Sequence, residues 1–571
     1  MHAIMVVLPL IALAGRAPDE TVAPLSVRAF SAAVGPVANA PGMVAAAYET
    51  VLTPFGGGED MGVLESKVDS AALAAACPGL GTTNFSEIQD APTRVTSARL
   101  VEASGGLPAY CQVQGLVMPS VGFELRLPTS NWNGKFFEAG CGGFCGNIPV
   151  GACDPPLIKG YACIASDMGN RGGRTNGLVF YNDLQAQIDF GFRGAHVTAL
   201  AGKAITEHYY AKAPNKAYFM GCSSGGQQAL SEAQRFPWDF DGIVAGAPSP
   251  TFSGPMMYYE WAGRHLVGKV SPADLKLLHD GAVRKCDLDD GLNDGIIGYP
   301  QGCKFDPAEL LCPAGRTTSC LTMTQVEAVK KVYAGPTTSK GDKIYTGGPL
   351  VGSELNWYGA GPAYGNTSIT GAYADSSGTS ISAWPSEYFR YVGFMPAQGP
   401  IGKYPGFDFD RDYKRLGMAE ALFGNANNPD LRKFAAAGGK MILYNGLADQ
   451  SDIPSDAIDY YETAEKTMGG RAATEKFFRL FLVPGMDHCW GGEGAFAIDY
   501  LSYLEAWVER GQAPDMMIAA HPKEESSLRY KFPLDATNVS FSRPVYPYPL
   551  RAKYKGTGDP SDAANFSAAK P

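Results

Sequence analysis

A serine flanked by glycines stands where a predicted strand gives way to a predicted helix. The run Gly221-Cys222-Ser223-Ser224-Gly225 follows the apolar residues 217–220 and opens the amphipathic stretch 225–236. In that context a Gly-x-Ser-x-Gly pattern places the central hydroxyl on a sharp, strained turn, for which neighbouring glycines leave room. The following helix would direct its free N–H groups towards a developing oxyanion. The pattern predicts that Ser223 is a nucleophile for acyl transfer.

Few residues can serve as the base that such a serine needs. The base is a histidine oriented by a carboxylate, and folds with this serine turn order the three as serine, acid, histidine. Five of the seven histidines precede the second group of predicted strands, which leaves His488 and His521. His488 directly follows the predicted strand 478–483, whereas His521 lies in a polar stretch. We predict that His488 is the base.

An acidic residue follows the preceding predicted strand in the same way. The apolar run 440–444 leads into a loop that carries Asp449, and Asp452 lies three residues further on. Ligands and reacting groups gather at the carboxyl ends of parallel strands, so this loop should lie beside the loop of His488. We predict that Asp449 orients the histidine, with Asp452 as the alternative.

Two cysteines adjoin the predicted catalytic residues. Cys222 immediately precedes Ser223, and Cys489 immediately follows His488. If the hydroxyl and the imidazole meet, the two cysteines come within the Cα separation of about 5–6 Å that a disulfide requires. We therefore expect a Cys222–Cys489 bridge.

The elements around these residues alternate between strand and helix. Short apolar runs at 135–139, 161–166, 217–220 and 242–245 are typical of buried parallel strands. Helical spacing at 184–210 and 225–236 separates them, and the rhythm resumes at 440–444, 455–467, 478–483 and 495–510. This alternation predicts an α/β fold with a mostly parallel sheet.

The alternation stops once, over residues 250–425, which are rich in Gly, Ser, Tyr and Pro. We predict an α/β-hydrolase core made of residues 15–249 and 426–571, interrupted by a large lid over the carboxyl ends of the strands. A strand-like fragment at 545–554 is expected to complete the edge of the sheet.

Composition limits the location and the partners. The net charge of -10 and the lack of a Lys/Arg run argue against a nucleic-acid partner. Twelve cysteines without a CxxC pair favour disulfides in an exported protein. Residues 1–14 resemble a signal peptide, and no apolar run is long enough to span a membrane. We expect a secreted or periplasmic protein with a small-molecule substrate. The sequence indicates no oligomeric state.

At this point the chain resembles the tannase and feruloyl esterase family, which includes mono(2-hydroxyethyl) terephthalate hydrolases. The resemblance rests on Gly221-Cys222-Ser223-Ser224-Gly225-Gly226, on Gly446-Leu447-Ala448-Asp449 and on His488-Cys489, and it covers about residues 131–510. It implies a Ser–Asp–His triad whose serine and histidine are linked through adjacent, disulfide-bonded cysteines. The chain departs from the family after Asp449. The family usually has proline there, whereas this chain has Gln450-Ser451-Asp452.

The resemblance also implies a structural calcium ion in the lid. The acidic run 286–296 looks like the family's calcium loop, and closely spaced carboxylates with backbone carbonyls suit Ca²⁺. The implied ligands are the carboxylates of Asp287, Asp290 and Asp294 and the carbonyls of Leu292 and Ile296.

Further disulfides and the oxyanion donors follow from the same resemblance. The implied bridges are Cys286–Cys303, Cys312–Cys320 and Cys77–Cys111, and proximity suggests Cys145–Cys153 and Cys141–Cys163 for the remaining four. The Gly-rich loop after residue 139 matches the family's oxyanion loop. One donor would be the N–H of Ser224, and the other that of Gly142 or, as the alternative, Gly143.

Together these features predict a serine carboxylic-ester hydrolase that acts on aromatic acid esters, as feruloyl esterases do. Aromatic residues of the lid would stack on the acyl group: Trp357, Tyr358, Tyr364, Tyr373, Trp384, Tyr388, Phe389 and Tyr391. The alternatives are a tannase, a terephthalate half-ester hydrolase, or a non-catalytic calcium-stabilised binding protein on the same fold.

Overall fold

The structure is a computed structural model that describes residues 69–357, 383–401, 405–524 and 536–571. The predicted signal peptide (1–14) and three lid aromatics, Tyr358, Tyr364 and Tyr373, lie outside the described residues. Within the described part no helix is long and apolar enough to cross a membrane.

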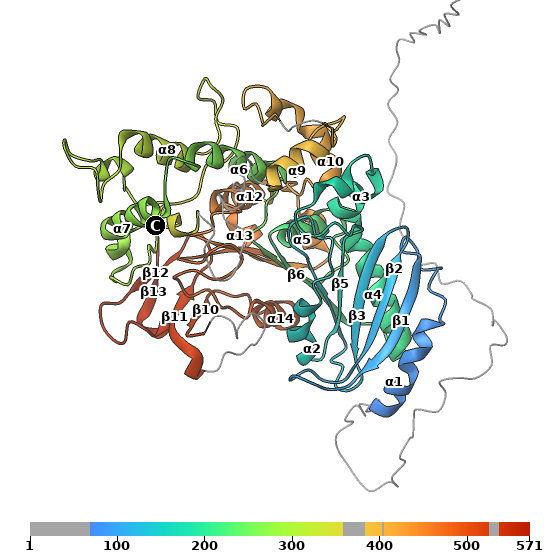
Figure 1. The fold of residues 1–571 in the computed structure, drawn as a ribbon. Helices are drawn as coiled ribbons and strands as arrows, with labels where there is room; N and C mark the ends of the chain where they lie inside the picture. The colour runs from blue at the N-terminus through green and yellow to red at the C-terminus, as the bar shows by residue number, and fades with distance from the viewer. Residues whose placement is uncertain (1–68, 358–382, 402–404, 525–535) are drawn as a thin grey trace, which may run out of the picture. The chain divides into compact units, whose positions relative to one another are not determined.

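A nine-stranded sheet forms the centre of the molecule, in the order β1-β2-β3-β5-β4-β6-β7-β8-β9 (Figure 1). The six parallel strands are β4 (Lys135–Ala139), β5 (Ala162–Ser166), β6 (Lys216–Cys222), β7 (Gly242–Gly246), β8 (Lys440–Gly446) and β9 (Phe478–Val483). Nearly all residues of β4, β5, β7 and β8 are buried, as expected for apolar strands covered on both faces of the sheet. The predicted α/β fold with a mostly parallel sheet is confirmed.

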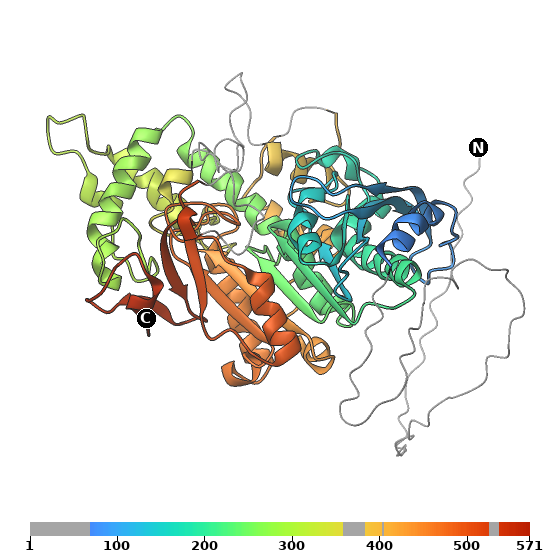
Figure 2. The same cartoon turned by 90° about the horizontal axis from the view of Figure 1, so that it is seen from below.

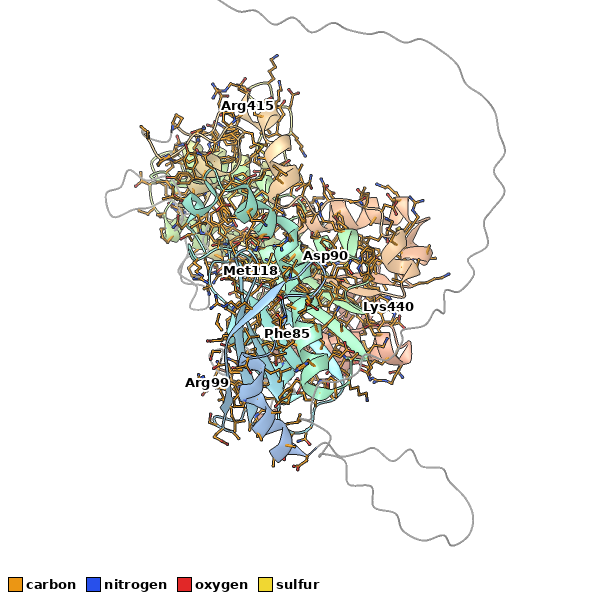
Figure 3. The ribbon with its side chains drawn as sticks, turned by 90° about the vertical axis from the view of Figure 1, so that its right-hand side faces the viewer. Phe85, Asp90, Arg99, Met118, Arg415 and Lys440 are labelled. Atoms are coloured by element: carbon orange, nitrogen blue, oxygen red, sulfur yellow. A yellow bond between two sulfur atoms is a disulfide. The ribbon has the colours of Figure 1, made fainter. Side chains whose placement is uncertain are left out.

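Three antiparallel strands extend the sheet on one side: β1 (Thr93–Val101), β2 (Tyr110–Val117) and β3 (Val121–Pro128). β1 forms one edge and lies towards the viewer in Figure 3, where Arg99 is labelled. Helices cover both faces. One face carries α4 (Gly194–Tyr210), α5 (Ser224–Arg235) and α12 (Pro454–Thr467), and the other carries α14 (Tyr500–Arg510). The helix predicted over 184–210 is divided into α3 (Leu184–Ile188), a π turn around buried Asp189, and α4.

The chain between β7 and β8 contributes no strand to this sheet in its described residues. It forms α6 (Ser253–Leu266), α7 (Pro272–Cys286), α8 (Met323–Ala334), α9 (Ala383–Tyr391), α10 (Gly417–Phe423) and α11 (Arg432–Ala436). Part of this segment has an apolar core of its own, which includes Leu275, Val329 and Trp357. Figures 1 and 2 both show α7 and α8 on the side of the sheet away from β1. The boundaries of the lid remain a prediction.

The tail does not complete the sheet edge, contrary to the sequence-based prediction. It forms two separate antiparallel pairs, β10 (Met517–Pro522) with β11 (Val539–Val545) and β12 (Arg551–Tyr554) with β13 (Phe566–Ala569). Between them the tail makes only an isolated bridge with β9, at Phe481 and Pro547, where the N–H of Tyr548 donates to Leu480. Pro544, Pro547 and Pro549 lack the N–H groups that a further strand would need.

All twelve cysteines form disulfides, and two of the expected pairings are wrong. Cys222–Cys489, Cys77–Cys111, Cys286–Cys303 and Cys312–Cys320 are joined as expected. The other four pair as Cys141–Cys145 and Cys153–Cys163, instead of Cys145–Cys153 and Cys141–Cys163. The reason is local: the turn through Gly142 and Gly143 brings the Cα atoms of Cys141 and Cys145 to 5.4 Å.

Candidate active site

Ser223 occupies a strained turn between β6 and α5. Its φ of 64° and ψ of -126° are rare for a residue with a side chain. The turn requires the adjacent glycines, since a Cβ on Gly221 would lie 2.5 Å from the carbonyl oxygen of Gly225, and one on Gly226 would lie 2.2 Å from that of Gly246. This is the geometry of a nucleophile elbow, and the helix that follows starts at Ser224.

Asp449 and His488 form a buried pair beside this turn. Asp449 Oδ2 lies 3.0 Å from His488 Nδ1, and both residues are almost fully buried. The backbone N–H groups of Ser451 and Asp452 donate to Asp449 Oδ1, and the side-chain amide of Asn445 reaches Oδ2 at 3.3 Å. The carboxylate is therefore held in place on both oxygens and can orient the imidazole.

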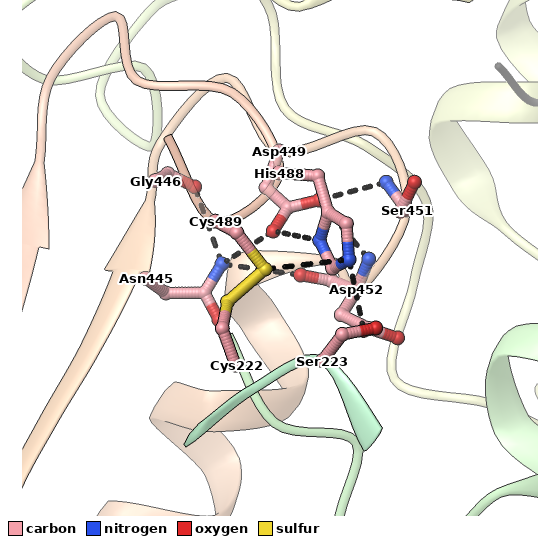
Figure 4. The surroundings of a disulfide bond; sticks show 9 residues. All are labelled: Cys222, Ser223, Asn445, Gly446, Asp449, Ser451, Asp452, His488 and Cys489. Carbon is pink, nitrogen blue, oxygen red and sulfur yellow. Dashed lines mark hydrogen bonds and ion pairs between the residues drawn. A yellow bond between two sulfur atoms is a disulfide. The ribbon is translucent and has the colours of Figure 1, made fainter. Parts of the chain in front are cut away.

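Asp452 faces the other side of the histidine and also contacts the serine. Its Oδ2 lies 3.3 Å from Ser223 Oγ, which donates to it, and 3.7 Å from His488 Nε2. Its Oδ1 accepts a hydrogen bond of 2.5 Å from Ser249. The structure thus places Asp449 at Nδ1, the position of the orienting acid in a triad, and Asp452 near Nε2 and Ser223 Oγ. Figure 4 shows this arrangement.

The two carboxylates change the acidity of the histidine. Burial by itself lowers the pKa of His488, but the charges of Asp449 and Asp452 and the hydrogen bond to Asp449 outweigh it and raise that pKa to about 9. Burial also raises the pKa of the Asp452 carboxyl to about 6, against the opposing charge of His488. The site therefore binds protons more tightly than isolated side chains would.

The Cys222–Cys489 disulfide joins the loop that carries Ser223 to the loop that carries His488. Its Cα atoms lie 5.9 Å apart and join residues separated by 267 positions in the chain. Figure 4 shows the sulfur bridge beside the imidazole, with Cys489 Sγ 3.7 Å from His488 Nε2. The bridge fixes the loop of the histidine to the serine turn.

A cavity of about 290 Å³ opens next to Ser223 and His488. Gly142 lines it, whereas Gly143 is not among its lining residues. The N–H of Cys141 donates to Gln228 on α5, which anchors the Gly142 loop to the helix that carries Ser224. Gly142 is therefore better placed than Gly143 to donate to an oxyanion in this cavity.

The aromatic wall of the cavity comes from the hydrolase core. It consists of Tyr444, Trp490, Phe496 and Tyr500. Of the lid aromatics expected to stack on substrate, the described ones do not line this cavity. Trp357, Tyr388, Phe389 and Tyr391 are instead buried in apolar cores, and Trp384 stacks against Phe144. No local sequence pattern marks this wall, Ser249 or the cavity-lining Arg174, because these residues approach the site only through the three-dimensional fold.

The acidic loop after α7 holds three carboxylates whose charges act on one another. Asp287 and Asp290 are buried, and their pKa values are raised by burial and by the charges of neighbouring acidic residues, Asp294 among them, to about 6 in the case of Asp290. Arg543 from the tail lies 2.6 Å from Asp294 Oδ2. The backbone N–H groups of Asp294, Gly295 and Ile296 donate to the carboxylates of Asp287 and Asp294. Carboxylate oxygens are ligands of the kind that Ca²⁺ prefers, and calcium at this loop remains a prediction.

A second cluster consists of one histidine and two acidic residues. His196, Glu232 and Asp239 offer ligand atoms that all lie within 4.8 Å of one another. His196 Nδ1, however, lies 2.5 Å from Asp239 Oδ2, so that nitrogen is occupied by the carboxylate. We interpret this group as a hydrogen-bonded His196–Asp239 pair next to Glu232.

Comparisons with known proteins identify the family. The family described as "Tannase and feruloyl esterase" matches residues 106–569. The chain is 34% identical to mono(2-hydroxyethyl) terephthalate hydrolase of Piscinibacter sakaiensis, over 83% of this chain and 87% of that protein. It is 31% identical to a probable feruloyl esterase of Arthroderma benhamiae, over 78% of this chain and 82% of that protein. The crystal structure of feruloyl esterase B from Aspergillus oryzae is similar, with a TM-score of 0.73, 27% identity, and coverage of 87% of this chain and all of that one. This chain therefore belongs to the tannase and feruloyl esterase family of carboxylic ester hydrolases.

Proposed function

We propose that this protein hydrolyses esters of aromatic acids through a serine acyl-enzyme, as a feruloyl esterase does. The observation that carries the proposal is that Ser223, on a nucleophile elbow, lines the same cavity as His488, whose Nδ1 is held by a buried carboxylate. The Cys222–Cys489 bridge supports it, because it fixes the serine and histidine loops to each other. A non-catalytic binding protein would have no use for this arrangement.

The reaction proceeds in two steps. Ser223 Oγ attacks the ester carbonyl carbon while His488 Nε2 takes its proton, and Asp449 holds the imidazole in the required tautomer. The N–H groups of Ser224 and Gly142 stabilise the oxyanion, each by about 3 kcal/mol. His488 returns the proton to the departing alcohol oxygen. Water, deprotonated by the same histidine, then attacks the acyl-enzyme and releases the acid and the free serine.

The cavity beside Ser223 suits a planar acyl group. Tyr444, Trp490, Phe496 and Tyr500 line it and can pack against an aromatic acid such as a hydroxycinnamate. A terephthalate half-ester is the second candidate, because Arg174 places a guanidinium at the same cavity, where it can pair with a free carboxylate. Galloyl esters, the substrates of tannases, are the third.

Hydrolysis of methyl ferulate, mono(2-hydroxyethyl) terephthalate and methyl gallate, measured in parallel, tests the substrate class. Ser223→Ala should lower kcat about 10⁴-fold or more, because the nucleophile is lost while the fold remains. Turnover undiminished in that variant would refute the serine mechanism. Comparable hydrolysis of acetate and ferulate esters would refute the aromatic acyl preference.

We further propose that the acidic loop binds a structural Ca²⁺ through Asp287, Asp290 and Asp294 with the carbonyls of Leu292 and Ile296. The ion would supply no chemistry to the reaction. We also propose that the protein is exported, secreted or periplasmic, which is supported by six disulfides, since these persist in oxidising compartments.

A further inference from the structure

The catalytic site holds one carboxylate more than a serine triad needs. In such a triad the serine proton passes to Nε2 of the histidine, while a single acid holds Nδ1. Asp449 fills that role here. Asp452 Oδ2 is a close neighbour of both atoms between which the proton moves, at 3.3 Å from Ser223 Oγ and 3.7 Å from His488 Nε2.

The position of Asp452 is firmly set by its surroundings. Ser249, which follows β7, donates to Oδ1 at 2.5 Å, and the backbone N–H of Asp452 donates to Asp449. The carbonyl of Asp452 accepts a hydrogen bond from Asn445. The residue is only 6% exposed, so water cannot solvate its charge. A buried carboxylate needs partners, and those of its side chain are two serine hydroxyls and the imidazole.

We propose that Asp452 is a further catalytic residue, which binds the Ser223 hydroxyl in the resting enzyme and retains a proton on the facing nitrogen of His488. The active form is then reached when His488 loses this proton to solvent. The Ser223 O–H turns from Asp452 to the freed Nε2, and attack can follow. This inference rests on the proposed serine mechanism and adds to it an alkaline working range.

The charges around the pair favour this behaviour. Asp449 and Asp452 both stabilise the imidazolium, and Arg174, across the cavity, opposes them. Around Asp452 the other titratable neighbours are Tyr259 on α6, Tyr345, and Asp456 on α12. The two tyrosines remain neutral, because burial raises their pKa values well above the usual range. Burial also raises the pKa of Asp456, to about 7.

The experiment is the pH dependence of kcat/KM for Asp452→Asn in the full-length protein. In the wild type kcat/KM should fall towards low pH as His488 becomes protonated, and the midpoint of this acid limb should lie above pH 7. The substitution keeps the size of the side chain but removes its charge, so the limb should move down by at least about one pH unit, the shift that one charge at 3.7 Å produces even in water. With the wild-type limb near the His488 pKa of about 9, the variant would retain about a tenfold larger fraction of its plateau activity at pH 7.

The matched control is Asp456→Asn, which makes the same chemical change at a buried carboxyl on α12. Its acid limb should stay where it is in the wild type. A limb that is unmoved or raised in Asp452→Asn overturns the inference. If that variant does not fold, a wild-type limb near the ordinary histidine value of about 6.5 overturns it equally. Failure of the serine mechanism itself would appear separately, as activity retained in Ser223→Ala.

Discussion

Two buried carboxylates face opposite nitrogens of His488, and their removal should have different consequences. Asp449 holds Nδ1 at 3.0 Å and is itself fixed by two backbone N–H groups, so it sets the tautomer and the orientation of the ring. Asp452 contacts the nucleophile and contributes charge at Nε2. The first role determines whether the base works at all, and the second determines at which pH it works.

Asp449→Asn should therefore lower the plateau kcat about 10⁴-fold, because the amide favours the wrong tautomer of the imidazole. KM should change little, since Asp449 does not line the cavity. Steady-state kinetics on the alkaline plateau measure both quantities. A variant that keeps wild-type kcat, together with an inactive Asp452→Asn, would assign the orienting role to Asp452 instead.

The catalytic residues were predictable because each one follows directly from a strand. Ser223, Asp449 and His488 lie within a few residues of the ends of β6, β8 and β9. Their order along the chain leaves only His488 and His521, and only His488 directly follows a predicted strand. Ser249 and Arg174 were not predictable, because no local pattern marks a hydroxyl or a guanidinium that approaches the site only through the fold. The second role of Asp452 escaped prediction for the same reason.

At the level of elements, the oxyanion loop is closed by a disulfide. Cys141 and Cys145 bracket Gly142 and Gly143 in a ring of five residues, and Gln228 on α5 binds the backbone of Cys141. A constrained loop keeps the Gly142 N–H in position without reorganisation during the reaction. The Gln228 contact thus links α5, the helix that follows Ser223, to the proposed oxyanion donor Gly142.

The double variant Cys141→Ser/Cys145→Ser should lower kcat about tenfold or more, because the loss of one oxyanion donor costs up to about 10²–10³. It should also lower the free energy of unfolding by about 2 kcal/mol, as expected for a short loop. Cys153→Ser/Cys163→Ser is the matched control and should lose stability while keeping kcat. Equal kcat in both double variants would show that the loop closed by Cys141–Cys145 has no part in catalysis.

The parallel strands were predictable from buried apolar runs, whereas the antiparallel strands and the tail were not. β1 and β2 show neither a continuous buried run nor a strict alternation of buried and exposed residues. Their sequence signal for a strand is therefore weak. The tail contains strand-forming residues, but its prolines remove the donors that pairing with β9 would require. Disulfides between nearby cysteines depend on turn geometry, and for that reason the spacing alone gave the wrong partners.

At the scale of the whole molecule, the acidic loop connects the lid segment to the C-terminal tail. It follows α7, is crosslinked by Cys286–Cys303, and meets the tail through Arg543 with Asp294 and Arg551 with Asp289. The resemblance to the family implied this loop, but not its contacts with the tail, which is remote in the chain. A cation here would join two segments that the central sheet does not hold.

Removal of calcium should therefore lower the thermal stability and leave the chemistry intact. Ca²⁺ at about 100 times its Kd should stabilise the folded protein by about 2.7 kcal/mol, so a chelator should lower Tm and added Ca²⁺ should restore it, while kcat at 25 °C stays unchanged. Asp290→Asn removes a proposed ligand and should abolish the response of Tm to Ca²⁺. Asp289→Asn, which changes a neighbouring carboxylate outside the proposed ligand set, should keep that response. Equal Tm values with chelator and with Ca²⁺ in the wild type would show that the loop is stabilised by its hydrogen bonds and arginine pairs alone.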